Sequence, residues 1–248
     1  MPSLVQVKAG ATQSPPLTIT LDSATTGGNC LVALIGDVAV DNNGVPSGIT
    51  LGGAADHWAQ AAIQGSGTDH GVAAGWADPN CAGGQSAVVI TTTGGAGTEN
   101  VFAWVFEFSG LGGTLDQSSG GANSFAATWD SGATPVTSQA SEVWFGIMCG
   151  TSSGTPSLAG PASPWVNEAQ QSSGQWAAIC GYQVTSSAGS ADYAGTASPD
   201  GTADVLVFTL PGSGSPPPPG PAAAPVPSAG AVSGWILLPA QGRVGSAG

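Results

Sequence analysis

The two histidines, His57 and His70, are the side chains of this sequence best suited to proton transfer or metal binding near neutral pH. Each directly follows an aspartate, Asp56 and Asp69 respectively. In a hydrolytic triad the histidine lies between a nucleophile and a carboxylate. Neighbouring residues in a strand point to opposite faces, so neither Asp-His pair is a ready-made dyad, and no GxSxG motif supplies a nucleophile. We therefore interpret both histidines as surface residues in turns.

Other metal ligands are present, but they lack a recognisable spacing. The histidines form neither an HExxH motif nor an i, i+4 pair. Asp37, Asp41 and Asn43 do not follow the ligand order of an EF-hand loop, and the cysteines have no CxxC spacing. We therefore predict no metal and no other cofactor. We expect buried free thiols, with two disulfides as the alternative, for Cys30, Cys81, Cys149 and Cys180.

Carboxylates offer only a weak case for enzymatic activity. Glycosidases use a pair of carboxylates, and Glu107 is of interest because it lies within an apolar, strand-like run. No second carboxylate can be assigned to it from the sequence. We therefore interpret Glu107 as a structural residue and predict that the protein is not an enzyme.

Tryptophans could form a surface that binds sugars or proteins, because the chain has eight of them. Five stand near the expected ends of strands or in loops, where a platform for carbohydrate stacking would lie. Burial in the core or in a protein interface is the alternative that we favour, since Trp is a frequent anchor of interfaces. The five candidates are Trp58, Trp76, Trp129, Trp165 and Trp176.

One strand is expected to organise the fold around these residues, namely the run 101–110, VFAWVFEFSG. Side chains alternate between the two faces of a strand, which places Phe102, Trp104, Phe106 and Phe108 on one face. Each buried aromatic covers roughly 150–250 Å², so this face needs a second layer above it. A helix would scatter the four rings around its circumference, and the period therefore favours a strand.

Further β-like runs are separated by clusters of Gly, Pro, Ser, Asn and Asp, and no amphipathic helix or internal repeat is evident. Turn signals at intervals of roughly 8–12 residues predict an all-β fold, a two-sheet antiparallel β-sandwich of jelly-roll type. The Gly-rich run 111–123 is expected to be a loop. The other expected strands are 3–8, 17–21, 29–36, 49–51, 58–64, 70–77, 86–93, 124–129, 142–149, 176–185 and 203–210.

The composition changes abruptly after residue 210, which divides the chain into a sandwich domain (1–210) and a tail. The Pro-, Ala- and Gly-rich run 211–230 is expected to be an extended, semi-rigid spacer. The segment 231–248 carries an apolar cluster that would be exposed unless it docks. We expect it to dock on a neighbouring subunit, with folding back onto its own sandwich as the alternative. The expected docking residues are Trp235, Ile236, Leu237, Leu238 and Pro239.

The charge composition limits the partners. The chain has 15 acidic residues and only two basic ones, Lys8 and Arg243, for a net charge of -13. Phosphates cannot be neutralised by such a chain, so we expect no binding to nucleic acid or to an anionic membrane surface. No apolar run approaches the roughly 20 residues of a membrane span. The first residues lack the pattern of a secretory signal, so we expect synthesis and assembly in the cytoplasm, or release by a route other than general secretion.

The runs VQVKAG, GGNCLVA and FEFSGLGGTLDQ, with a later Tyr-containing strand, carry a family resemblance. In this order they resemble a β-sandwich module of structural proteins from tailed phages that infect actinobacteria. The resemblance covers approximately 1–210 and implies an accessory protein of the virion, either a capsid decoration protein or a minor tail protein. The matching residues are Val5, Gln6, Ala9, Gly10, Gly28, Asn29, Leu31, Val32, Ala33, Glu107, Ser109, Gly110, Leu115, Asp116, Gln117 and Tyr182.

Resemblance and composition together lead us to expect a non-enzymatic structural protein on the exterior of a virion. A capsid decoration role is favoured, with the C-terminal tail as part of the anchor. The expected partners are major capsid or tail proteins of the same particle and further copies of this chain in a homo-oligomer or symmetric array. The alternatives are a minor tail protein and an adhesin that binds carbohydrate on the host envelope.

Overall fold

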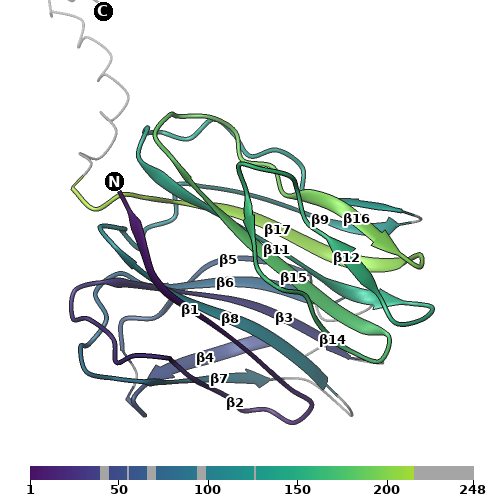
Figure 1. Cartoon of the computed structure of the whole chain (residues 1–248), viewed down its shortest axis with the longest axis horizontal. Coiled ribbons are helices and arrows are strands. Elements are labelled where there is room, and N and C mark those ends of the chain that lie inside the picture. Colours follow the sequence, from purple (N-terminus) through teal and green to yellow (C-terminus); the bar gives the residue numbers. More distant parts are fainter. Residues whose placement is uncertain (40–44, 55, 66–70, 94–98, 126, 215–248) are drawn as a thin grey trace, which may run out of the picture. The chain divides into compact units, whose positions relative to one another are not determined.

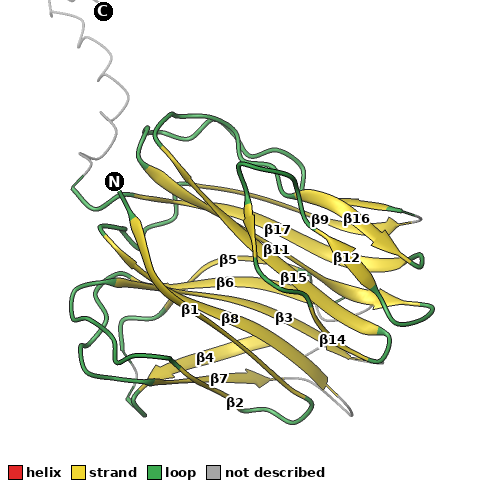
Figure 2. Ribbon diagram, in the orientation of Figure 1, coloured by secondary structure: helices red, strands yellow, loops and turns green. Residues whose placement is uncertain are grey.

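Antiparallel strands and the turns between them make up the described part of the chain, in which no residue is helical (Figure 2). The computed structural model describes residues 1–39, 45–54, 56–65, 71–93, 99–125 and 127–214. No helix long and apolar enough to cross a membrane occurs within these ranges. The predicted all-β sandwich is confirmed, but four sheets are present where the sequence indicated two.

The first eight strands form two of the four sheets (Figure 1). One has the order β1-β8-β3-β6-β5 and the other the order β2-β7-β4. The first strand pairs with the eighth, the second with the seventh and the third with the sixth, which is how a jelly roll is wound. Their bounds are β1 (Ser3–Thr12), β2 (Leu17–Thr20), β3 (Cys30–Ala39), β4 (Val45–Leu51), β5 (Ala59–Gln64), β6 (Val72–Asp78), β7 (Ala87–Thr93) and β8 (Glu99–Ser109).

The remaining strands repeat this topology. Their larger sheet has the order β9-β17-β11-β15-β13, with β14 also paired to β15, and their smaller sheet has the order β10-β16-β12. The chain therefore contains two jelly-roll halves in sequence, although no repeat is visible in the amino acids. The bounds are β9 (Gln117–Phe125), β10 (Thr128–Asp130), β11 (Glu142–Ser152), β12 (Ser157–Ala159), β13 (Val166–Asn167), β14 (Gln171–Ser173), β15 (Trp176–Thr185), β16 (Ala194–Ser198) and β17 (Gly201–Pro211).

The two larger sheets pack face to face, and each is covered on its other face by the smaller sheet of its own half (Figure 1). Three hydrophobic cores separate the four layers. The central core joins the two halves, the second lies within the first half and the third within the second half. Both larger sheets are thus buried on both faces, which explains the nearly continuous apolar runs of β3, β8 and β11.

The aromatic face of β8 fills the central core, as its alternation predicts. Phe102, Trp104, Phe106 and Phe108 are all 0–1% exposed. The ring of Phe106 lies 5.8 Å from that of Phe145 on β11 in an edge-on arrangement, one of the geometries that aromatic pairs prefer. The strand that organises the first half therefore also joins it to the second half.

Strand β9 corrects the prediction of a loop over 111–123. It has few apolar side chains, so its sequence, QSSGGANSF, lacks the alternation of a half-buried strand. Its pairing with β17 uses backbone hydrogen bonds, which do not depend on the side chain. Small residues are needed because β9 passes close to the first half: a Cβ on Gly120 would lie 2.8 Å from Oε1 of Gln64.

The described part of the chain ends shortly after β17, at residue 214. One compact unit spans Met1–Pro216. After β17 the backbone N–H of Gly212 donates to Ser141 O at 2.7 Å, and that of Ser213 donates to Gly110 O at 2.8 Å. The expected docking segment around Trp235 lies outside the described residues.

Candidate functional site

Asp56, His57 and Asp78 form a cluster at one end of the first half. Nδ1 of His57 lies 2.8 Å from Oδ1 of Asp56 and 3.8 Å from Oδ1 of Asp78. The imidazole is 64% exposed, whereas the side chains of Asp56 and Asp78 are 11% and 0% exposed. The cluster corrects our view that an adjacent Asp-His pair cannot meet: the two residues precede β5 in a bend, so strand alternation does not apply.

The two carboxyl groups of this cluster lie in contact and titrate together. Burial raises the pKa of Asp78, and the neighbouring charge of Asp56 raises it further. Burial alone would raise the pKa of Asp56 as well, but the N–H of Ala82, donating at 3.0 Å, and the Asp78 carboxyl hold it below its usual value. Oδ1 of Asp78 accepts one hydrogen bond, from the N–H of Asn80 at 3.1 Å.

A hairpin brings the three residues together. Strands β5 and β6 are antiparallel, and Ala59 is the register partner of Ala77. Residues just before β5 therefore lie beside the last residue of β6, which is Asp78. The sequence indicated Asp56 and His57 as possible ligands but gave no reason to place Asp78 beside them. Predicting the pairing of β5 with β6 would have placed Asp78 beside Asp56 and His57. The separation of these residues along the sequence does not indicate that they are neighbours in the fold.

The other residues considered as ligands lie apart from this cluster. His70, Asp69, Asp41 and Asn43 are outside the described residues, and Asp37 is buried in β3. The prediction of buried free thiols is confirmed for the four cysteines. Burial raises the pKa of Cys30 and of Cys81 to about 12, so both thiols stay protonated at neutral pH.

Glu107 is buried and hydrogen-bonded. Its side chain is on the face of β8 opposite the aromatics, and the residue is 1% exposed. Its carboxylate accepts hydrogen bonds from the N–H of Thr26 at 2.9 Å and from the side-chain amides of Asn29 and Gln6, both at 2.6 Å. The contact joins β1, β8 and the segment between β2 and β3. Gln6, Asn29 and Glu107 are among the residues that carry the family resemblance, and they converge here.

A second carboxyl pair involves Glu142 at the start of β11. Burial raises the pKa of Glu142 to about 7, and the hydrogen bond and negative charge of Asp116 add to the shift. Asp116 accepts two hydrogen bonds from Ser138, one from its N–H and one from its hydroxyl, both at 2.7 Å. The carboxyl group of Glu142 therefore favours its protonated form below about pH 7.

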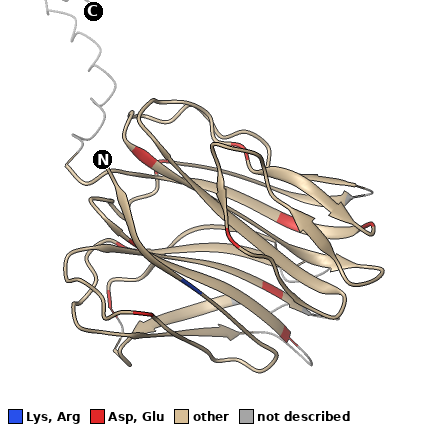
Figure 3. Ribbon diagram, viewed as in Figure 1, with Lys and Arg blue, Asp and Glu red and all other residues tan. Residues whose placement is uncertain are grey.

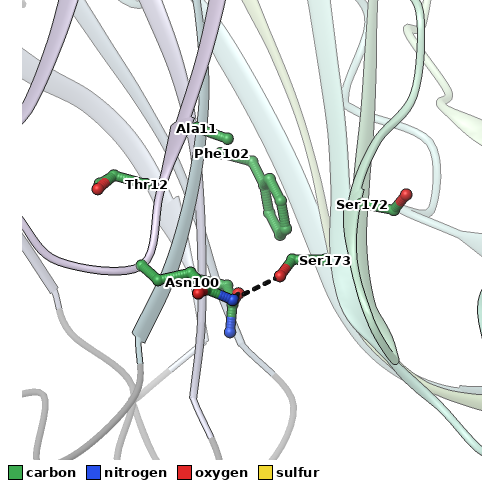
Figure 4. A pocket seen from close by; sticks show the side chains of 7 residues that line it. Ala11, Thr12, Asn100, Phe102, Ser172 and Ser173 are labelled. Atoms are coloured by element: carbon green, nitrogen blue, oxygen red, sulfur yellow. Dashed lines mark hydrogen bonds between the residues drawn. The ribbon is translucent and has the colours of Figure 1, made fainter.

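A pocket of about 270 Å³ opens where the two halves meet (Figure 4). The amide of Gln13 bridges it, donating to Asn100 Oδ1 at 3.2 Å and to Ser173 Oγ at 2.7 Å. Asn100 is fully buried, and its Nδ2 has no hydrogen-bond acceptor. The pocket thus combines one phenyl ring with amides and hydroxyls. It is lined by Ala11, Thr12, Gln13, Asn100, Phe102, Ser172 and Ser173.

The five candidate tryptophans lie in all three cores. Trp58 and Trp76 are half-buried against the core of the first half, and the indole N–H of each is buried without an acceptor. Trp129 is 1% exposed and donates to Thr196 O at 3.1 Å. Trp165 packs on Tyr193 in the third core, and Trp176 on the edge of the central core. Binding of sugars or proteins through them stays a prediction.

Fold and sites together define an all-β protein of two stacked jelly-roll halves, with a carboxylate-histidine cluster on the first half and a small pocket where the halves meet. No known protein family, curated protein or solved structure matches the chain.

Proposed function

We propose that the chain is a non-enzymatic structural protein of a virus particle, most simply a decoration protein on the exterior of the capsid. The observation that carries this proposal is the pair of stacked jelly-roll halves, since jelly rolls are a recurrent architecture of viral capsid and lectin domains. This is an argument from fold, and it agrees with the resemblance of the VQ-AG, GN-LVA and E-SG-LDQ motifs to phage structural proteins.

The distribution of charge supports a role in binding other protein subunits. At least six of the 15 acidic residues are buried. Lys8, the one basic residue of the described chain, is paired with Asp22 at 2.6 Å (Figure 3). The surface is therefore poor in ions, and a surface poor in ions loses little hydration energy when a partner covers it. Capsid proteins and further copies of the chain are the proposed partners.

Locating the chain in purified particles tests this proposal. Reconstruction of the virus that encodes it should place the four-layered body on the capsid exterior, and quantitative mass spectrometry should find many copies per particle. A few copies at one vertex or at the tail would favour a minor tail protein. Absence from the particle would refute both roles. Deleting 211–248 should reduce incorporation if the tail is part of the anchor.

Carbohydrate binding is a second candidate function, favoured by the pocket in Figure 4. Sugar-sized ligands need a few fixed polar groups and an apolar wall, and Gln13, Asn100 and Phe102 supply these. A glycan array that includes bacterial envelope sugars should then give saturable binding. Ser173→Phe, which fills the pocket, should abolish it, whereas Ser187→Phe in an exposed turn should not. An array without binders would contradict this function.

A further inference from the structure

We propose that Asp56, His57 and Asp78 bind a divalent transition-metal cation of the zinc type. The three residues offer two carboxylate oxygens and one imidazole nitrogen within 4.8 Å of one another. Zinc binds such atoms at about 2.0–2.2 Å, so neighbouring ligands of a tetrahedral ion lie roughly 3.3–3.5 Å apart. The distances from His57 Nδ1 to the two aspartates, 2.8 and 3.8 Å, bracket that separation.

Asp78 supplies a second, independent reason for a cation. Its side chain is fully buried, and its Oδ2 accepts no hydrogen bond. A buried carboxylate oxygen normally has a donor, because leaving it without one costs free energy. The side chain beside Asp78 is the carboxyl of Asp56, which is hydrogen-bonded to it and whose negative charge raises the pKa of Asp78. A metal ion would satisfy both carboxylates at once.

Within the described ranges no lysine or arginine lies beside the cluster. Lys8 is the single lysine or arginine within the described ranges, and it pairs with Asp22 on another part of the first half. The imidazole of His57 lies beside the two carboxylates and is largely exposed to water. The cluster thus has a deficit of positive charge, which a divalent ion would offset.

The ligand set selects the class of ion. Calcium and magnesium take oxygen ligands, whereas an imidazole beside carboxylates suits zinc and similar transition metals. Three protein ligands leave a position for water or for a side chain of a partner. The bound ion would tie the segment before β5 to the end of β6, and it would stabilise the loops at this end of the first half.

Thermal unfolding and calorimetric titration with zinc chloride at pH 7.5 test the site. Zinc at about 100 times its dissociation constant should raise the melting temperature by roughly 5–10 °C. Asp78→Asn and His57→Gln should each weaken binding by at least about 100-fold, since even the loss of an outer contact costs about 10–100-fold. Asp200→Asn, at an exposed carboxylate, is the matched control and should bind as the unmodified chain does.

Three outcomes decide between a specific site and a general attraction of cations to an acidic chain. Equal zinc stabilisation of the unmodified chain and Asp78→Asn would overturn the proposal, as would equal weakening by Asp200→Asn. Nitrogen NMR gives a readout that does not depend on stability: zinc should shift Nδ1 of His57, and a spectrum unchanged by zinc would also overturn it. His57→Gln removes only an exposed side chain, so it keeps the test valid if Asp78→Asn fails to fold.

Discussion

Glu107 is the buried carboxylate with the most complete set of donors, and its replacement gives the clearest test of its role. Glu107→Gln keeps the shape but places an amide NH₂ among three N–H donors. At least one of the three would then face another donor. Hydrogen bonds to a charged group contribute about 1.5–3 kcal/mol each, so we expect a loss of roughly 2–4 kcal/mol in the free energy of unfolding.

Urea unfolding of this variant checks the prediction, with Glu168→Gln as the control. Glu168 is half-buried, and burial raises its pKa, so its amide variant should change stability by under about 1 kcal/mol. A Glu107→Gln variant as stable as the unmodified chain would contradict a structural role for the carboxylate.

Glu142 should make the fold less stable as the pH rises toward neutrality. Its pKa is raised from 4.5 to about 7, so the folded chain keeps a proton that the unfolded chain has already lost. The contribution is fully present below about pH 4.5, falls through the window from 4.5 to 7, and is constant above it. The change is on the order of 3 kcal/mol.

Denaturant unfolding at pH 5 and at pH 7.5 measures this dependence. Glu142→Gln has no proton to lose, so the difference between the two pH values should shrink by most of that amount. If the variant kept the full dependence, another group would have to be responsible. Asp192, whose pKa is raised by burial and by Asp130, is the next to examine.

At the residue level, the sequence indicated which residues could act as ligands, but not which of them lie together in the fold. Asp56 and His57 were identified as ligand-type residues, but their partner Asp78 was not, because a β-hairpin supplies the contact. Asn100 and Gln13 carried no signal at all. They lie far apart in the chain, and the pocket exists only because β1 and β8 of the first half meet β14 of the second half.

At the level of elements, the strands with strong alternation or continuous apolar runs were predictable, and the short polar ones were not. β3, β8, β11, β15 and β17 fill the central core, so their composition reveals them. β9, β12, β14 and β16 are short or rich in Gly and Ser, and they are held by backbone pairing to a neighbour. Local sequence carries no information about such a neighbour.

Close packing of elements across the halves can be tested at Gly75 on β6. A Cβ at this position would overlap the ring of Phe208 on β17. Gly75→Ala should therefore lower the free energy of unfolding by about 1–3 kcal/mol or more, as overpacking does. Combining it with Phe208→Leu should recover part of that loss, because the smaller side chain makes room.

Chemical denaturation measures both variants, and Gly154→Ala is the control. A Cβ at Gly154 would lie 3.6 Å from Pro199, an ordinary contact, so a change within about 0.5 kcal/mol is expected. Equal effects of Gly75→Ala and Gly154→Ala would mean that the two larger sheets are not packed this tightly.

For the whole molecule, the repeated topology gives each half a central pair of strands in its larger sheet. In each half the third strand pairs with the last at the centre of the larger sheet: Val32 with Phe106 in the first and Phe145 with Phe208 in the second. The order in which the strands pair is the same in the two halves, and many different amino-acid sequences can adopt that order. A search for repeated residues therefore finds nothing, whereas the sandwich class follows from the alternation alone.

The stacked arrangement predicts that neither half is stable alone. Each would expose the apolar face of its larger sheet, and exposed faces of this kind drive association. Fragments 1–114 and 115–248, separated between two exposed residues, should be aggregation-prone when expressed singly and should form a one-to-one complex when co-expressed. Gel filtration with mass determination measures this.

Phe106→Asp in the central core should abolish the complex, and Val136→Asp, at a residue that is 65% exposed, should leave it intact. Two fragments that each fold as monomers and stay apart would mean that the central core adds little to the stability of either half, and that the molecule behaves as two domains on one chain.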